Sequence, residues 1–439
     1  MSHAIFYNKP VIKITGGKNM NSFEKIIGYD SIKTELMQIC DMIKNPDIYS
    51  ALGAKLPRGV LLYGPPGLGK TMMAKCFIEE SGLPSFTVRK VKSEDFVEYI
   101  TEIFSKAGES GPSIVFLDDM DKFANEDDEH VDAEEYVAIQ AAIDGVRDKA
   151  VFVIATANEL WKLPKSLLRS GRFDRDIEFF SPNETDCKKI IEHYLADKSV
   201  SDKLNIDDIS KMITYSSCAD LEVIINEAAI EAGFKRKAKI DMDDVVKAVL
   251  KKEYNAPDEL TKVSEAELKK VAFHEAGHVV MSDILCPGSV GLASLRVSGN
   301  ESVGGFVRRC KKLKNAEEHA LVSLAGKVAV ELYYGECADG CSSDVSRATD
   351  QIRREMAANG LMGFGMLDVS CRYEGERSPG YLERSEAVVQ SELHRIMYKA
   401  KSLLLKNKNY LEAVVNALLE KETLVASDVL KIKEKLQTE

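Results

Sequence analysis

Residues 64–71 have the residue types and spacing of a phosphate-binding loop. They read Gly-Pro-Pro-Gly-Leu-Gly-Lys-Thr and follow the apolar run 60–63. Backbone N–H groups of such a turn, together with the start of the next helix, converge on phosphate oxygens. We expect Lys70 to reach the β- and γ-phosphates of ATP and the Thr71 hydroxyl to hold Mg²⁺. The predicted nucleotide-contacting residues are Gly64, Pro65, Pro66, Gly67, Leu68, Gly69, Lys70, Thr71 and Met72.

Polar side chains follow two later apolar runs. Asp118 and Asp119 end the run 114–117, which is where a nucleotide hydrolase places the groups that hold Mg²⁺ and activate water. We expect Asp118 to contact Mg²⁺ through water and Asp119 to polarise the attacking water. Asn158 follows the run 151–155 and can orient that water or sense the γ-phosphate, although asparagines are common in turns.

Three arginines lie within residues 169–175. A solvated basic turn is one interpretation of this segment. Beside a nucleotide site, arginine fingers that reach a neighbouring subunit are favoured, because the charge that develops on the γ-phosphate requires bidentate cations.

A second group of chemically active residues lies in the C-terminal half. His274 and His278 are four residues apart on a predicted helix, so both imidazoles share one face and can bind one Zn²⁺. Glu275 can then take a proton from the attacking water. The alternative is a pair of core histidines.

A third protein ligand for the zinc must come from elsewhere in the chain. Asp344 is a candidate, because Ser342 or Ser343 can cap a helix that starts there. Without the histidine pair, Asp344 would be explained as a first-turn carboxylate that interacts with the helix dipole. The expected buried stripe of this helix is Val345, Ala348, Ile352 and Met356.

Composition excludes several classes of protein. The chain has 439 residues, of which 45% are hydrophobic, so about three domains are expected. Its 59 basic and 70 acidic residues give a net charge of −11, which argues against nucleic acid as a partner. The nine scattered cysteines are consistent with reduced thiols in a cytoplasmic protein. No run approaches the roughly 20 apolar residues of a membrane span.

The order of the elements predicts a multidomain protein with an α/β part and a mainly helical part. Short apolar runs alternate with helical patterns up to residue 179, which is typical of a parallel sheet covered by helices. Helical patterns then continue alone. We predict an arm (1–20), a large α/β domain (21–185), a helical lid (186–253), a linker (254–263) and a mostly helical domain (264–439). Ser264 and Glu267 form a capping box, and an apolar helix is expected over residues 317–334.

In this order, the motifs resemble the FtsH family of AAA proteases from about residue 22 onward, without the family's N-terminal membrane-spanning part. Residues 52–62, 95–98, 219–221 and 347–349 also match. The resemblance implies a parallel-sheet AAA+ ATPase domain with its lid and a zinc metallopeptidase domain. It also implies protein or peptide substrates, the cofactors ATP, Mg²⁺ and Zn²⁺, and a homo-oligomeric ring, normally a hexamer. By position, Arg169 and Arg172 resemble the arginine fingers and Asn158 resembles the sensor. His274, His278 and Asp344 resemble the zinc ligands, with Glu275 as catalytic base, and residues 304–307 resemble a substrate-binding edge strand.

Three features depart from the family pattern. Asp119 stands where glutamate is usual, which shortens the side chain by one methylene and is expected to slow ATP hydrolysis. After residues 95–98 the family continues with a pore loop that grips substrate, whereas here Tyr99 and Ile100 run directly into a helical pattern. Those two residues, or residues 89–92, could take the place of the pore loop in gripping substrate. Cys218 replaces a glycine.

The sequence therefore predicts an ATP-dependent zinc metalloendopeptidase that degrades proteins in a ring. One alternative is an ATP-gated zinc peptidase of unfolded chains with weak unfolding power. A second is a non-proteolytic AAA+ chaperone, which a zinc content of one per chain together with casein cleavage would exclude.

Overall fold

The computed structural model describes residues 22–90, 95–124, 133–169, 171–257, 264–296, 304–335, 341–359 and 379–438. The predicted arm and residues 258–263 of the predicted linker lie outside these ranges. The chain separates into two compact units, described in turn below. The first comprises Met1–Ile190 and Tyr215–Leu221, and the second comprises Ile191–Thr214 and Glu222–Glu439.

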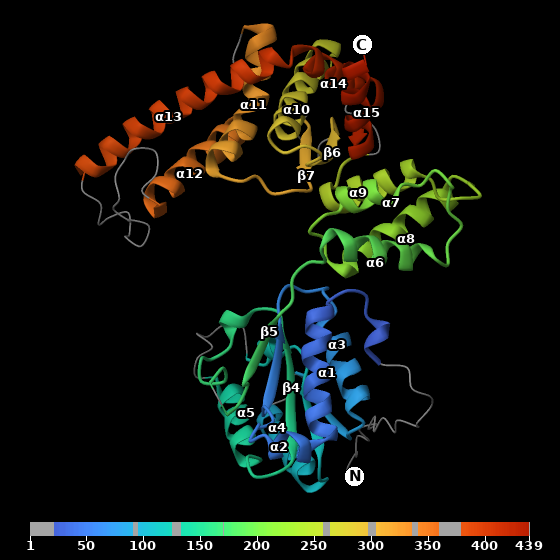
Figure 1. Ribbon diagram of the computed structural model, residues 1–439, viewed down its shortest axis with the longest axis vertical. Helices are drawn as coiled ribbons and strands as arrows, with labels where there is room; N and C mark the ends of the chain where they lie inside the picture. Colours follow the sequence, from blue (N-terminus) through green and yellow to red (C-terminus); the bar gives the residue numbers. More distant parts are fainter. Residues whose placement is uncertain are drawn as a thin grey trace, which may run out of the picture. The chain divides into compact units, whose positions relative to one another are not determined.

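The first unit is built on a five-stranded sheet, of which β4 and β5 are labelled in Figure 1. The strand order is β2-β3-β4-β1-β5. All its neighbouring strands run parallel, as the sequence predicted. Its strands are β1 (Gly59–Tyr63), β2 (Ser85–Val88), β3 (Ser113–Leu117), β4 (Val151–Ala157) and β5 (Arg175–Glu178). Because the strands are parallel, the residues that follow β1, β3 and β4 meet at one edge of the sheet.

Helices cover both faces of this sheet (Figure 1). Successive strand residues point to opposite faces. Leu62 therefore packs with α1 (Asp30–Lys44) and α3 (Lys70–Ser81), and its neighbour Leu61 packs with α4 (Phe96–Glu109) and α5 (Glu134–Gly145). The helical elements of this part are η1 (Ser22–Lys25), α1 (Asp30–Lys44), α2 (Pro46–Ala51), α3 (Lys70–Ser81), α4 (Phe96–Glu109), η2 (Met120–Lys122), α5 (Glu134–Gly145) and η4 (Leu160–Lys162).

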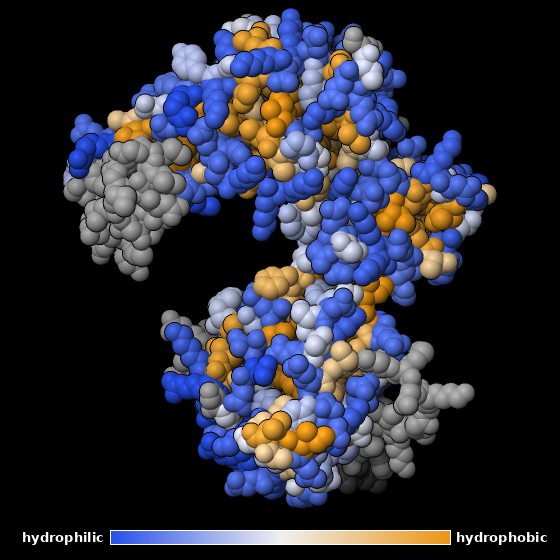
Figure 2. All heavy atoms as spheres, viewed as in Figure 1, coloured by the Kyte–Doolittle hydropathy of each residue, from blue (hydrophilic) through white to orange (hydrophobic). Residues whose placement is uncertain are grey.

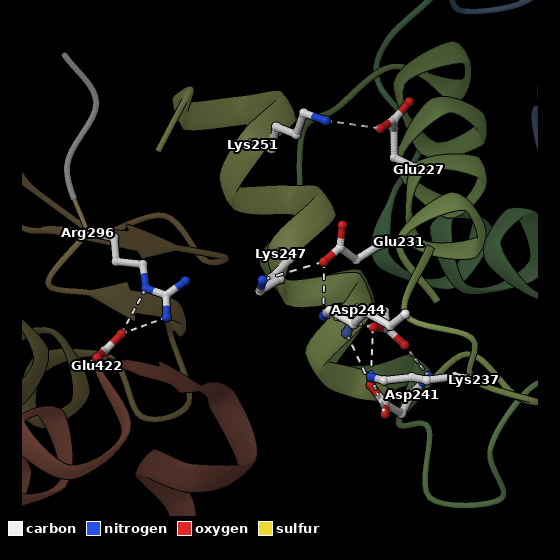
Figure 3. Close-up of polar contacts among 10 residues, drawn as sticks. Glu227, Glu231, Lys237, Asp241, Asp244, Lys247, Lys251, Arg296 and Glu422 are labelled. Atoms are coloured by element: carbon white, nitrogen blue, oxygen red, sulfur yellow. Dashed lines mark hydrogen bonds and ion pairs between the residues drawn. The ribbon is translucent and has the colours of Figure 1, made fainter. Parts of the chain in front are cut away.

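A helical segment follows β5, as predicted, with one isolated β-bridge between Val200 and Ile240. It contains α6 (Glu184–Leu195), α7 (Ile206–Met212), α8 (Cys218–Phe234) and α9 (Met242–Tyr254). Asp241 and Asp244 form a capping box at the start of α9. Figure 3 shows that ion pairs such as Glu231 with Lys247 join α8 to α9. These pairs lie near the surface, so each contributes at most about 1 kcal/mol.

The C-terminal part is mostly helical with a small antiparallel sheet in the order β7-β6-β8. Its elements are α10 (Glu265–Leu285), β6 (Val290–Ser294), β7 (Phe306–Arg309), α11 (Ala316–Tyr334), α12 (Ser342–Asn359), α13 (Pro379–Lys406), α14 (Lys408–Lys421), β8 (Thr423–Val425) and α15 (Ala426–Thr438). Arg296, just after β6, pairs with Glu422, just before β8 (Figure 3).

Two local predictions for this part can be compared with the structure. The capping box of Ser264 and Glu267 is present at the start of α10. Ser342 and Ser343 lie inside the first turn of α12, because this helix begins at Ser342, so neither precedes it as the predicted cap. Among the described helices, none is both long and apolar enough to cross a bilayer.

Gly277 allows α10 and α11 to pack closely. A Cβ atom at this position would lie 2.9 Å from the Ala325 carbonyl carbon and 2.9 Å from Ala329 Cβ. Because the obstructing atoms include backbone, the two helices would have to separate. We expect Gly277→Ala to lower the free energy of unfolding by about 2 kcal/mol, measured by urea denaturation. Gly233→Ala is the control: that glycine lies in α8 with open space around it, so alanine there should stabilise the protein slightly.

Candidate nucleotide site and metal centre

The predicted phosphate loop connects β1 to α3. Gly67 and Gly69 have φ angles of 78° and 86°, a left-handed conformation that favours glycine, and Gly69 directly precedes α3. Lys70 is buried, and its Nζ donates hydrogen bonds to the carbonyl oxygens of Gly64 at 2.7 Å and Pro65 at 2.8 Å. Burial lowers the pKa of Lys70, although the charges of Asp119 and Asp121 oppose this effect.

Side chains at the ends of two further strands, β3 and β4, converge on this loop. Lys70 donates to Asn158 Oδ1 at 2.9 Å, and Thr71 Oγ1 donates to Asp118 Oδ1 at 2.9 Å. Thr156 Oγ1 also donates to Asp118 Oδ1 at 2.9 Å. Hydroxyl and carboxylate oxygens side by side next to a glycine-rich loop fit Mg²⁺, which prefers hard oxygen ligands together with phosphate. The chemistry of this donor set therefore suits Mg²⁺ and a nucleotide.

Asp119 lies beside Asp118 but makes different contacts. Its φ angle is 57°, and its backbone N–H donates to Thr156 Oγ1 at 2.9 Å. Its Oδ2 accepts a hydrogen bond from Lys122 Nζ at 2.9 Å. A cation of the same chain therefore holds the predicted water-activating carboxylate.

The two predicted arginine fingers differ in their surroundings. Arg172 is held within its own chain, since it donates to Asp144 Oδ2 at 2.8 Å and to Gln140 Oε1 at 3.0 Å. Arg169 is exposed. Of the two, Arg169 has the side chain that can more readily reach another subunit.

Lys70→Ala should weaken ATP binding by roughly 10- to 100-fold, because a hydrogen bond from a charged donor is worth about 1.5–3 kcal/mol. Calorimetry would measure the change. Lys75→Ala, which removes an exposed lysine from the same helix, is the matched control. Unchanged affinity of the Lys70 variant would contradict the assignment of this loop.

In the second unit, the structure brings His274, His278 and Asp344 together. The two histidine Nε2 atoms are 3.1 Å apart, and Asp344 Oδ2 lies 3.0 Å from His274 Nε2 and 3.3 Å from His278 Nε2. Atoms bound to one zinc ion at about 2.1 Å with tetrahedral angles are about 3.4 Å apart. Two imidazoles and a carboxylate in this arrangement fit a zinc ion that keeps a position open for a further ligand.

Surrounding groups orient the three candidate ligands. His278 Nδ1 donates to the Val322 carbonyl of α11 at 2.7 Å, which leaves the Nε2 lone pair free for a metal. Arg347 Nη2 donates to Asp344 Oδ1 at 2.7 Å. Burial opposes ionisation of Asp344, but its contacts with the His274 and His278 imidazoles outweigh burial and hold the pKa of Asp344 below its usual range. Cys341 Sγ lies 4.0 Å from His274 Nδ1.

Glu275 is buried beside this cluster, with only 4% of its surface exposed. The pKa of Glu275 is raised to about 7: burial is the largest cause, the charge of His274 opposes it, and the charge of Asp344 adds to it. A Cβ atom at Gly305, just before β7, would lie 2.8 Å from Glu275 Oε1, so backbone of this segment closely approaches the carboxylate. A carboxyl group that titrates near neutral pH can both accept and donate a proton.

Sequence reasoning missed several residues that shape these two sites. They are Arg89 and Lys122, which bind Asp118 and Asp119, and Val322, Gly326 and Arg347, which surround the metal cluster. Arg89 directly follows β2, which neighbours β3. A basic residue at that end of an adjacent parallel strand was therefore a usable signal. No sequence signal could have shown the contribution of α11, because that contribution consists of a backbone carbonyl and a glycine.

Comparisons with known proteins give two family matches and several similar chains. Residues 60–181 match the ATPase family associated with various cellular activities, and residues 261–432 match peptidase family M41. The chain is 30% identical to ATP-dependent zinc metalloprotease FtsH 3 of Symbiobacterium thermophilum, over 96% of this chain and 72% of the relative. It is 31% identical to FtsH of Caldicellulosiruptor bescii, over 94% of this chain and 72% of the relative. It is 30% identical to FtsH of Ureaplasma parvum serovar 3, over 96% of this chain and 62% of the relative.

This chain thus spans between 62% and 72% of the lengths of these three relatives. The two matched ranges contain the phosphate loop, the two carboxylates after β3 and the histidine pair of α10. The chain belongs to the FtsH family of ATP-dependent zinc metalloproteases.

Proposed function

We propose that this chain cleaves internal peptide bonds of protein substrates at a zinc ion and uses ATP hydrolysis to deliver the substrate. The observation that carries the proposal is the convergence of His274, His278 and Asp344 beside a buried Glu275. The same chain has a phosphate loop whose Thr71 contacts Asp118. The α/β part (21–185) with its lid (186–253) would supply the ATPase, and residues 264–439 the peptidase.

In the peptidase site, each residue has a proposed task. His274, His278 and Asp344 would hold zinc, which when bound polarises the scissile carbonyl and increases the acidity of water. Glu275 would take a proton from the attacking water and pass it to the leaving nitrogen, for which a pKa of about 7 is suitable. The segment from Gly305 into β7 lies against Glu275, so an extended substrate that pairs with this strand would run past the carboxylate.

In the ATPase site, Lys70 and the backbone of residues 64–72 would bind the phosphates. Thr71 and Asp118 would hold Mg²⁺, while Asp119 and Asn158 would position the attacking water. Arg169 and Arg172 would act on the nucleotide of a neighbouring subunit. Because Lys122 already holds Asp119, Asp119 would have to exchange this partner for water during turnover.

The proposed assembly is a hexameric ring in the cytoplasm. Figure 2 shows apolar surface over the helical lid and near α2. Large exposed apolar side chains of these segments are Ile230 and Phe234 of α8, Ile48 of α2, and Leu52 just after α2. Phe234 is 82% exposed. Apolar patches of this kind are typical of interfaces, and a ring would cover them. Free thiols at seven described cysteines are compatible with a reducing compartment.

One observation favours the second candidate function, an ATP-gated peptidase of unfolded chains. Tyr99 and Ile100 lie inside the continuous helix α4, where Ile100 is fully buried and Tyr99 donates to the Thr87 carbonyl at 3.3 Å. Ile100 therefore cannot grip substrate as the sequence suggested. Arg89 and Lys90 are also engaged, with Asp118 and Glu135 respectively. Residues 91 and 92 lie outside the described part.

The test compares degradation of a stably folded, tagged substrate with that of the same substrate in unfolded form. Each form is incubated with ATP, with a non-hydrolysable ATP analogue, or with ATP and a zinc chelator. We expect ATP-dependent, chelator-sensitive cleavage of both forms. If only the unfolded form is cleaved and the analogue supports the reaction, the gated peptidase is the correct function. If neither form is cleaved by a zinc-loaded protein, the proposal is wrong.

A further inference from the structure

Arg89 binds the carboxylate to which Mg²⁺ is assigned. Its Nε donates to Asp118 Oδ2 at 2.7 Å, and its Nη2 donates to the same oxygen. We propose that Arg89 competes with Mg²⁺ for Asp118, so that this arginine sets the metal dependence of nucleotide binding. The inference depends on the nucleotide site described under the proposed function and adds a regulating residue to it.

All hydrogen-bond acceptor positions of the Asp118 carboxylate are occupied. None is left for Mg²⁺ or for a water molecule bound to Mg²⁺. Its Oδ1 accepts from Thr71 and from Thr156, and its Oδ2 accepts from two nitrogens of Arg89. A carboxylate offers about four acceptor positions. Asp118 is only 4% exposed, so solvent does not provide an alternative approach. One of the present donors must leave before Mg²⁺ can use Asp118.

Arg89 is the donor that can leave most readily. Thr156 is fully buried, and its hydroxyl also accepts a hydrogen bond from the Asp119 N–H. Thr71 belongs to the phosphate loop itself. The Arg89 side chain is 60% exposed, so water can replace its hydrogen bonds to Asp118 once it swings out. A surface guanidinium paired with a buried carboxylate therefore serves as a displaceable counter-ion.

The positive charge of Arg89 determines whether each nucleotide affinity should rise or fall when this arginine is removed. With Arg89 in place, Asp118 is neutralised, so the negative phosphates of metal-free ATP meet less repulsion. When Mg²⁺ arrives, the guanidinium opposes it by like charge and by occupying its ligand. Without Arg89, metal-free ATP should bind more weakly and Mg·ATP more tightly. A purely structural role would instead weaken both.

The experiment measures the affinity for a non-hydrolysable ATP analogue by calorimetry, once with excess Mg²⁺ and once with a chelator. The full chain is used as wild type, Arg89→Ala, Arg89→Lys and Lys90→Gln. The ratio of the affinity with Mg²⁺ to the affinity with chelator is expected to rise about 10-fold in Arg89→Ala. A 10-fold change in affinity corresponds to the loss of about one charge-assisted hydrogen bond. Arg89→Lys keeps the charge and should lie between wild type and alanine.

Lys90→Gln is the matched control. It removes the same charge from the neighbouring residue, which pairs with Glu135 at 2.7 Å, so its ratio should stay at the wild-type value. A ratio in Arg89→Ala within threefold of wild type overturns the inference, and so does an equal loss of both affinities. A wild-type chain that binds no nucleotide overturns both this inference and the proposed function. A raised ratio in a chain that degrades no protein supports the inference while contradicting the proposed function.

Discussion

Glu275→Gln should reduce peptide-bond hydrolysis by about 10³-fold while ATP hydrolysis continues. General acid–base catalysis by a positioned side chain contributes about 10²- to 10⁴-fold, and a glutamine amide can neither accept nor return the proton. Glutamine has nearly the same shape as glutamate, so the buried position of this side chain should tolerate it. Cleavage of a fluorescent casein, measured beside phosphate release, separates the two activities.

Two controls make this result specific to the peptidase site. Glu265→Gln alters an exposed glutamate in the first turn of the same helix and should cleave casein at the wild-type rate. The zinc content of Glu275→Gln should equal that of wild type, because Glu275 is not among the three converging ligands. Casein cleavage within tenfold of wild type would falsify the assignment of Glu275 as the base.

Gly326→Ala should remove zinc from the peptidase site. A Cβ atom at this position would lie 2.5 Å from His278 Nε2 and 2.8 Å from His274 Nε2, the two atoms assigned to the metal. Both imidazoles would have to turn away, since Gly326 belongs to the rigid helix α11. Changes to groups that only orient metal ligands typically cost 10- to 100-fold in affinity. Direct obstruction should therefore cost about 100-fold or more.

Competition with a chromophoric chelator would measure this zinc affinity, and circular dichroism would report whether α11 still forms. Alanine favours helix over glycine, so helicity should persist and ATP hydrolysis should continue. Gly233→Ala makes the same change at a site with open space and should keep its zinc. Wild-type zinc affinity in Gly326→Ala would mean that the metal lies elsewhere.

Features that depend on spacing along the chain were predictable from the sequence. The phosphate loop needs glycines at fixed positions within eight consecutive residues, and the paired imidazoles need two histidines four residues apart on one helix. The capping box at Ser264 and the buried residues Ala348, Ile352 and Met356 follow equally local rules. Such patterns place a side chain on one face or at one end of an element before any tertiary contact forms.

Features that depend on contacts between distant segments came only with the folded chain. Arg89 and Asp118 meet because β2 and β3 are neighbours in the sheet, and Ile100, a candidate for gripping substrate, is buried inside the continuous helix α4. The surroundings of the histidine pair come from α11, through the Val322 carbonyl and the missing side chain of Gly326. A backbone oxygen and the absence of a Cβ have no sequence pattern of their own. Sequence alone therefore determined the two chemistries of this chain, whereas tertiary packing decided which groups restrain and orient them.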